Sequence, residues 1–97
     1  MIGPKKTKTA RQLERHFKGV ANHWRIEALL LIANQKGMTV EGITKEVGGN
    51  FKTVAEHVRR LAQAGLVEKR YRGHAVEHSL SPYGKTFVSF IKTFSNS

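Results

Sequence analysis

The chain has 97 residues, and 17 Lys or Arg against seven Asp or Glu give it a formal net charge of +10. So short and basic a chain predicts one small domain with a polyanionic partner, nucleic acid before an acidic membrane surface. It contains no cysteine, which excludes disulfides, thiolate zinc sites and cysteine nucleophiles.

Residues 1–8 form a basic amino-terminal stretch with three lysines, Lys5, Lys6 and Lys8, beside a glycine and a proline. We expect a flexible arm that touches phosphates, and the alternative is a solvated tail without a role. One folded domain is predicted over residues 9–95.

A first helix is expected to start at Thr9, because Leu13, Phe17 and Val20 recur at helical spacing. Gly19 is predicted to close it.

A second helix is expected from His23 to about Asn34, with Asn22 as its cap and Gly37 as its end. It is apolar around much of its circumference, so it needs neighbours on several sides. We therefore predict that it is the central helix.

The next two helices are predicted to form a helix-turn-helix. Thr39 is a good cap for the first, Gly48 and Gly49 supply a tight turn, and Asn50 caps the second. Gly42, inside the first, either permits close packing or is merely tolerated. The second helix has an apolar stripe of Val54, Val58 and Leu61, and Gly65 stops it.

Beyond Gly65 the apolar period changes from helical to alternating. Residues 66–71 and 75–80 predict two strands of a hairpin around the loop 72–74, which must lean on the helices to be stable. Ser81 followed by Pro82 is a helix start. One side of this last helix is aromatic, with Tyr83, Phe87, Phe90 and Phe94.

The expected fold is mainly α with a small β-hairpin: a winged helix-turn-helix of about five helices and a two-stranded wing. Three stretches resemble bacterial and archaeal regulators of the ArsR and MarR types. VGGNFKTVAEHVRRLAQAGLVEKRYRGHAVEHSLS resembles their helix-turn-helix and wing, ANHWRIEALLLIANQKG the ArsR-type central segment, and LSPYGKTFVSFI the MarR-type final helix. The chain departs from the pattern at Gly49, where the family usually has an apolar residue, and at Ala55, where it often has a small hydroxyl residue.

The resemblance implies that the helix after the turn enters the major groove of DNA. The candidate contacts on it are Asn50, Lys52, Thr53, Glu56, His57, Arg59 and Arg60. The side chains from 52 to 57 would lie closest to the bases, whereas Arg59 and Arg60 would contact the DNA backbone or stay on the helix surface. The alternative for each is a solvated helix face.

A second group of cations lies around the hairpin tip, with Lys69, Arg70, Arg72 and His74. Such a wing is expected to reach a minor groove or flanking phosphates, although charged edge strands also resist aggregation. Arg25, which stands at the family's arginine position, completes the predicted DNA contacts with the lysines of the arm.

The terminal helices carry more apolar surface than one small core needs, which predicts a homodimer. Its candidate interface comprises Leu13, Phe17, Val20, Leu30, Phe87, Phe90, Ile91 and Phe94. A symmetric dimer would place two recognition helices about 34–36 Å apart. Alternatively, the two helices pack on each other within one chain.

No catalytic, metal or cofactor site is predicted, because the five histidines are scattered and no paired carboxylates occur. No small-molecule effector is identifiable, and without a separate ligand domain an effector would have to act at the dimer interface. No signal peptide and no apolar run long enough to cross a bilayer is visible.

We therefore expect a cytoplasmic, non-enzymatic homodimer that binds specific double-stranded DNA and regulates transcription in a repressor-like manner. Two alternatives stay open. One is a nucleoid-type DNA binder with low sequence specificity, and the other is a winged-helix module that binds protein or RNA.

Overall fold

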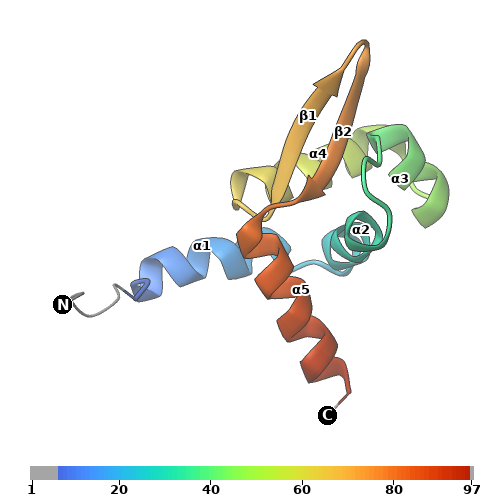
Figure 1. Ribbon diagram of the computed structural model, residues 1–97. Coiled ribbons are helices and arrows are strands. Elements are labelled where there is room, and N and C mark those ends of the chain that lie inside the picture. The colour runs from blue at the N-terminus through green and yellow to red at the C-terminus, as the bar shows by residue number, and fades with distance from the viewer. Residues whose placement is uncertain (1–6, 97) are drawn as a thin grey trace.

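The computed structural model describes residues 7–96, so Lys5 and Lys6 of the predicted arm lie outside the described residues. Within that range five helices and one hairpin follow one another (Figure 1). They are α1 (Ala10–Val20), α2 (His23–Asn34), α3 (Val40–Val47), α4 (Phe51–Gln63), β1 (Val67–Arg72), β2 (Ala75–Leu80) and α5 (Pro82–Ser95). The predicted winged helix-turn-helix is confirmed: α3 and α4 form the helix-turn-helix, and β1 with β2 forms the wing.

Each helix begins at a side-chain cap that satisfies backbone N–H groups of its first turn. At α1 the cap is reciprocal, since the Thr9 hydroxyl accepts from the Gln12 N–H at 3.2 Å and the Gln12 side chain accepts from the Thr9 N–H at 2.9 Å. The five caps are Thr9, Asn22, Thr39, Asn50 and Ser81.

Gly19 does not end the first helix, contrary to the prediction. It lies inside α1, where a Cβ atom would overlap that of Ala64, so glycine lets α1 cross the carboxyl end of α4 closely. Gly42 has no such role, because the nearest atoms to a Cβ there, in Met38 and Thr39, would lie at 3.5 Å. Glycine is merely tolerated at that position.

The core is built around α2, as predicted: α2 contacts α1, α3, α4, α5 and β2. Leu29 and Ile32 of α2 are almost completely buried. Val20, which we predicted to face a second copy, instead belongs to this core and is only 6% exposed. The other buried apolar residues are Ala28, Ile43, Val54, Val58, Leu61, Ala64, Leu66, Val67 and Val88.

The hairpin has a tighter turn than predicted. Arg72 pairs with Ala75, which leaves a turn of two residues, and its first residue, Gly73, has a φ of 59°. Two-residue hairpin turns require a positive φ at this position, which glycine adopts readily.

The wing is also anchored by a bridge that the sequence analysis missed. Met38, just before α3, pairs with His78 of β2, and the His78 N–H donates to the Met38 carbonyl at 2.9 Å. His78 is buried, and its Nδ1 lies 2.9 Å from the same carbonyl oxygen. The hairpin is thus tied directly to the helix-turn-helix.

The junction between the wing and α5 depends on two residues of the sequence Ser-Pro-x-Gly. The Ser81 hydroxyl donates to the Gly65 carbonyl at 2.6 Å and accepts from the Gly84 N–H at 2.9 Å. A Cβ at Gly84 would overlap the Leu66 carbonyl oxygen. From this point α5 runs outward, and α1 leaves the body in another direction (Figure 1). No helix in the described part of the chain combines the length and apolarity needed to cross a membrane.

Candidate nucleic-acid interface

The recognition helix α4 has one buried and one exposed side. Val54, Val58 and Leu61 bury one side against the core. The exposed side carries Lys52, Thr53, Arg59, Arg60 and Gln63, with Glu56 half-buried between them. The helix starts after Gly48, whose φ of 71° ends α3 and turns the chain toward α4.

At the amino end of α4, some candidate side chains are exposed, whereas another already forms a hydrogen bond within the helix. The Asn50 side-chain oxygen accepts from the Thr53 N–H at 3.2 Å, so the helix itself uses it. The side chains of Lys52 and Thr53 are exposed. Phe51 is also exposed, and the sequence analysis missed it because it expected only polar contacts on this face.

Glu56 forms an ion-pair cluster with the next two arginines along the helix. The Arg59 guanidinium donates to both of its carboxylate oxygens, from Nε at 2.9 Å and from Nη2 at 2.6 Å, and Arg60 Nε donates at 3.0 Å. The bonds from Arg59 and then Arg60 lower the pKa of Glu56 from 4.5 to about 2, and the same contact raises the pKa of Arg59. The spacing i, i+3 and i, i+4 is where such pairs form on a helix, so the sequence could have predicted them.

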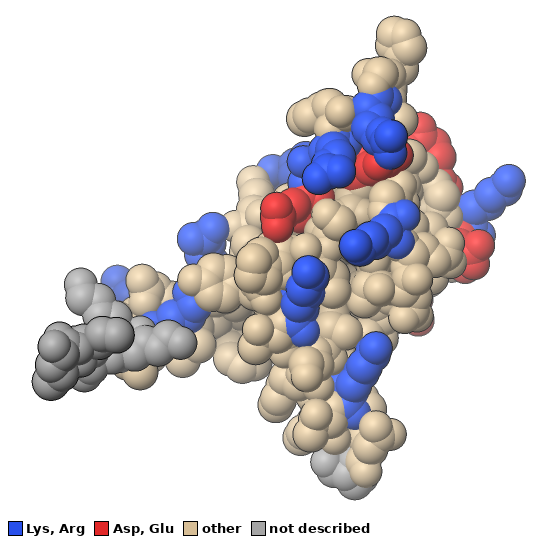
Figure 2. All heavy atoms as spheres, viewed as in Figure 1, with Lys and Arg blue, Asp and Glu red and all other residues tan. Residues whose placement is uncertain are grey.

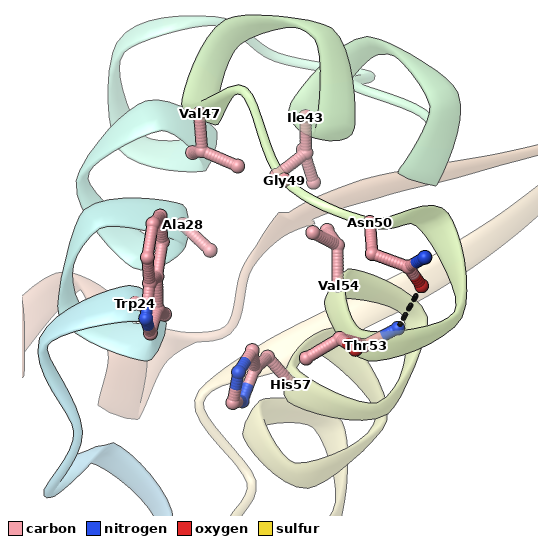
Figure 3. Close-up of a pocket in the computed structure, with 9 residues that line it drawn as sticks. All are labelled: Trp24, Ala28, Ile43, Val47, Gly49, Asn50, Thr53, Val54 and His57. Atoms are coloured by element: carbon pink, nitrogen blue, oxygen red, sulfur yellow. Dashed lines mark hydrogen bonds between the residues drawn. The ribbon is translucent and has the colours of Figure 1, made fainter.

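His57 lies behind the exposed face of α4 and not on it. It lines a pocket between α2, α3 and α4, and its Nδ1 is buried without a hydrogen-bond partner among residues 7–96 (Figure 3). Burial lowers the pKa of His57, and the positive charge of Arg25 adds to this effect. Arg25 is half-buried as well: its Nη2 donates to the Lys18 carbonyl at 3.5 Å, and its Nε is buried without a partner in the described chain.

The predicted cations of the wing are all exposed: Lys69, Arg70, Arg72 and His74. Arg72 is held only loosely, with its Nη1 3.9 Å from an oxygen of Glu77. Tyr71, between them, is 74% exposed; its sequence signal is an aromatic residue between the cations of the wing, which charge alone does not reveal. Figure 2 shows basic side chains below the tip of the hairpin and across the body, with few acidic side chains among them.

Of the three lysines in the predicted arm, only Lys8 is described. Its ammonium group lies 4.1 Å from the centre of the Tyr83 ring, a cation–π contact with α5. This places Lys8 beside the terminal helices and not beside α4. No cluster of three or more metal-ligating side chains occurs between residues 7 and 96.

Aromatic side chains cover the facing sides of α1 and α5. Phe17 meets Phe87 edge to face with ring centres 5.4 Å apart, and Phe90 and Phe94 continue the row. Phe90 and Phe94 are 52% and 70% exposed, and Leu13 and Phe17 are exposed too. A groove of about 250 Å³ lies between the two helices. The remaining interface candidates, Leu30, Phe87 and Ile91, are half-buried and pack against the core.

Comparison with known proteins identifies this arrangement. The model of the family described as "Bacterial regulatory protein, arsR family" matches residues 23–69, from α2 to the start of the wing. No curated protein sequence matches the chain significantly.

Solved structures match almost the whole chain. The homodimeric winged helix-turn-helix DNA-binding domain of Mb0332 from Mycobacterium bovis, described as a possible ArsR-family transcriptional regulator, is 26% identical, with a TM-score of 0.81 over 99% of this chain and 91% of that one. HlyU from Vibrio cholerae is 18% identical, with a TM-score of 0.81 over 95% and 100%. NolR from Sinorhizobium fredii is 16% identical, with a TM-score of 0.77 over 93% and 96%. The predicted resemblance is confirmed: residues 23–69 match the ArsR-family model, and the chain has the winged helix-turn-helix fold of these DNA-binding regulators.

Proposed function

We propose that this chain is a homodimeric, sequence-specific DNA-binding protein that regulates transcription in a repressor-like manner in the cytoplasm. The observation that carries the proposal is that the exposed positive charges lie on the parts of the fold that can reach DNA. Exposed cations lie on the free side of α4 and on the wing, which are the two parts of a winged helix-turn-helix that can enter the grooves of DNA.

Within this proposal different side chains of α4 face the bases and the phosphates of the DNA. Lys52 and Thr53, exposed at the amino end, are placed to read base edges in the major groove. Arg59 and Arg60 lie where they could reach phosphates, but Glu56 holds both guanidinium groups against the helix surface and so limits their contact with the DNA backbone.

The wing supplies the second contact. Lys69, Arg70 and Arg72 leave the body on a hairpin that is fixed to the helix-turn-helix by the Met38–His78 bridge. A narrow minor groove attracts arginine through its negative potential. The wing therefore adds affinity, while selectivity depends mainly on α4.

Dimerisation is proposed through α1 and α5. Phe90 and Phe94 are too exposed for a monomer in water, and the groove beside them is lined by apolar side chains. The similar domain of Mb0332 is described as homodimeric, which supports the proposal. A second copy on this surface would present two α4 helices to successive turns of one DNA duplex.

The proposal is tested by selecting bound sequences from random DNA and titrating the best site against salt. Affinity should fall with salt at a log–log slope of about −0.9 per phosphate contacted. Lys52→Ala should weaken binding to the selected site, whereas Lys85→Ala, an equal loss of charge on α5, should not. If the chain does not bind DNA, or if its affinity for DNA does not change with salt, the proposal is wrong.

One observation favours a second candidate, a nucleoid-type binder with little sequence preference. Glu56 is tied to two arginines and His57 is turned inward, which leaves few side chains on α4 to read bases. Comparing the selected site with random DNA separates the two, since specific binding is typically about 10³-fold or more tighter.

A further inference from the structure

An aromatic ring is exposed at the start of the recognition helix. Phe51 is the first residue of α4, and it is 52% exposed. It is neither part of the buried core nor one of the half-buried apolar residues that pack against the core. An exposed phenylalanine forgoes the free energy that burial of its ring would contribute. The folded protomer thus leaves this side chain available to a partner.

Phe51 borders a groove between the helix-turn-helix and the tip of the wing. Val40 of α3 lines one part of this groove, and Ala75 and Val76 of β2 line another. The groove has a volume of about 450 Å³ and also includes Thr39, Glu41 and His74. Phe51 therefore shares an apolar groove with side chains of two other elements, while half of the residue stays exposed to an incoming ligand.

The charges near this groove favour a polyanionic ligand. Lys52 follows Phe51 on α4 and is exposed, and the exposed cations of the wing are Lys69, Arg70 and Arg72. Glu41, in the first turn of α3, is the acidic residue of the groove lining. The amino end of α4 adds the positive end of a helix dipole. An exposed ring in such surroundings fits a ligand whose apolar groups lie between phosphates.

The major groove of DNA offers one apolar group of this kind, the C5-methyl group of thymine. Phenylalanine is among the side chains that contact this methyl group. The amino-terminal residues of a recognition helix are the ones that reach base edges, and Phe51 is the first residue of α4. Its side chain has no donor or acceptor, so it cannot read a base by hydrogen bonding.

We propose that Phe51 binds the C5-methyl group of a thymine in each half-site, so that the preferred DNA has a thymine–adenine pair at the start of α4. The inference rests on the proposed function, because it requires α4 to lie in the major groove. It adds an apolar contact to the polar contacts of Lys52 and Thr53. It also gives selectivity to a helix on which Glu56 is already bound by two arginines.

Replacing thymine by uracil tests the contact, because uracil lacks only this methyl group and pairs with adenine in the same way. The full chain is titrated by fluorescence anisotropy against its selected duplex and against duplexes in which each thymine in turn is replaced by uracil. Replacing the contacted thymine should weaken binding about fourfold per half-site, as expected for the loss of one buried methyl group. Uracil at the other positions should have little effect.

Three variants assign the effect to Phe51. Phe51→Ala should bind the thymine and uracil duplexes equally, because the shortened side chain no longer reaches the base. Phe51→Leu keeps an apolar side chain and should retain part of the preference. Lys52→Ala should bind both duplexes more weakly and keep the ratio of the parent. Since Phe51 lies outside the core, circular dichroism should show that its variants are folded.

Two results would overturn the inference. One is that uracil weakens binding of the parent at no thymine position, and the other is that the preference persists in a folded Phe51→Ala protein. Either result, obtained with salt-dependent binding to the selected duplex, leaves the proposed function intact. If no duplex binds at all, both the proposed function and the role of Phe51 are wrong.

Discussion

The ion-pair cluster on α4 leads to a prediction about how charge is used in DNA binding. In the variant Glu56→Gln the carboxylate that binds Arg59 and Arg60 is replaced by a neutral amide of the same shape. Both guanidinium groups then lose their strong partner while staying exposed at the same place on the helix. We expect each of them to reach a phosphate more readily, so that binding to unrelated DNA becomes tighter and more sensitive to salt.

The magnitude follows from the number of contacts. Two additional phosphate contacts per protomer steepen the log–log salt slope by about 1.8, at about −0.9 each. A fourfold rise in salt should then cost the variant about tenfold more affinity per bound protomer than it costs the parent. Fluorescence anisotropy with labelled duplex DNA across a salt series measures this slope.

A matched control separates local contacts from net charge. Glu14→Gln makes the same change of charge on α1, where Glu14 pairs with Lys18 at 3.3 Å. The control should leave the slope close to that of the parent. If Glu56→Gln and Glu14→Gln alter the slope equally, Arg59 and Arg60 have no special access to phosphates, and the assigned role of the cluster is wrong.

Three further predictions concern the dimer, the wing junction and pH. Replacing Phe90 and Phe94 together by Ser should convert a dimer to a monomer in light scattering, and an unchanged mass would contradict the proposed interface. Gly84→Ala should lower the free energy of unfolding by about 1–3 kcal/mol, as overpacking does, whereas Gly42→Ala should not lower it in the same chemical denaturation. His57 has a lowered pKa, so the unfolded chain binds its proton more readily, and stability should fall as pH drops below 6.5. A His57→Leu protein should show a weaker pH dependence in that range, and an identical dependence would refute the assignment.

The elements of the fold were readable from local sequence. Each helix start depends on a cap that bonds to an N–H two or three residues away, as at Asn22 and Ser81. The change from helical to alternating apolar spacing after Gly65 marked the wing equally well. Such interactions involve neighbours in the chain, and the sequence displays them directly.

The candidate site was readable only in part. The exposure of Lys52, Thr53 and the wing cations follows from helical and strand periodicity, which assigns each residue to a face. The ion pairs of Glu56 were also within reach, because their spacing is local. His57 lines a pocket between α2, α3 and α4, and helical spacing alone could not reveal this position, because it depends on how three helices pack.

Sequence alone therefore determined which segments are helix, turn and wing, and that the surface is strongly basic. Only the tertiary structure decided that Gly19 lies at a helix crossing, that Val20 is in the core, and that Met38 pairs with His78. Each of these depends on atoms that are far apart along the chain and meet only when the helices pack. Periodicity states which face of an element is buried, but not what that face meets.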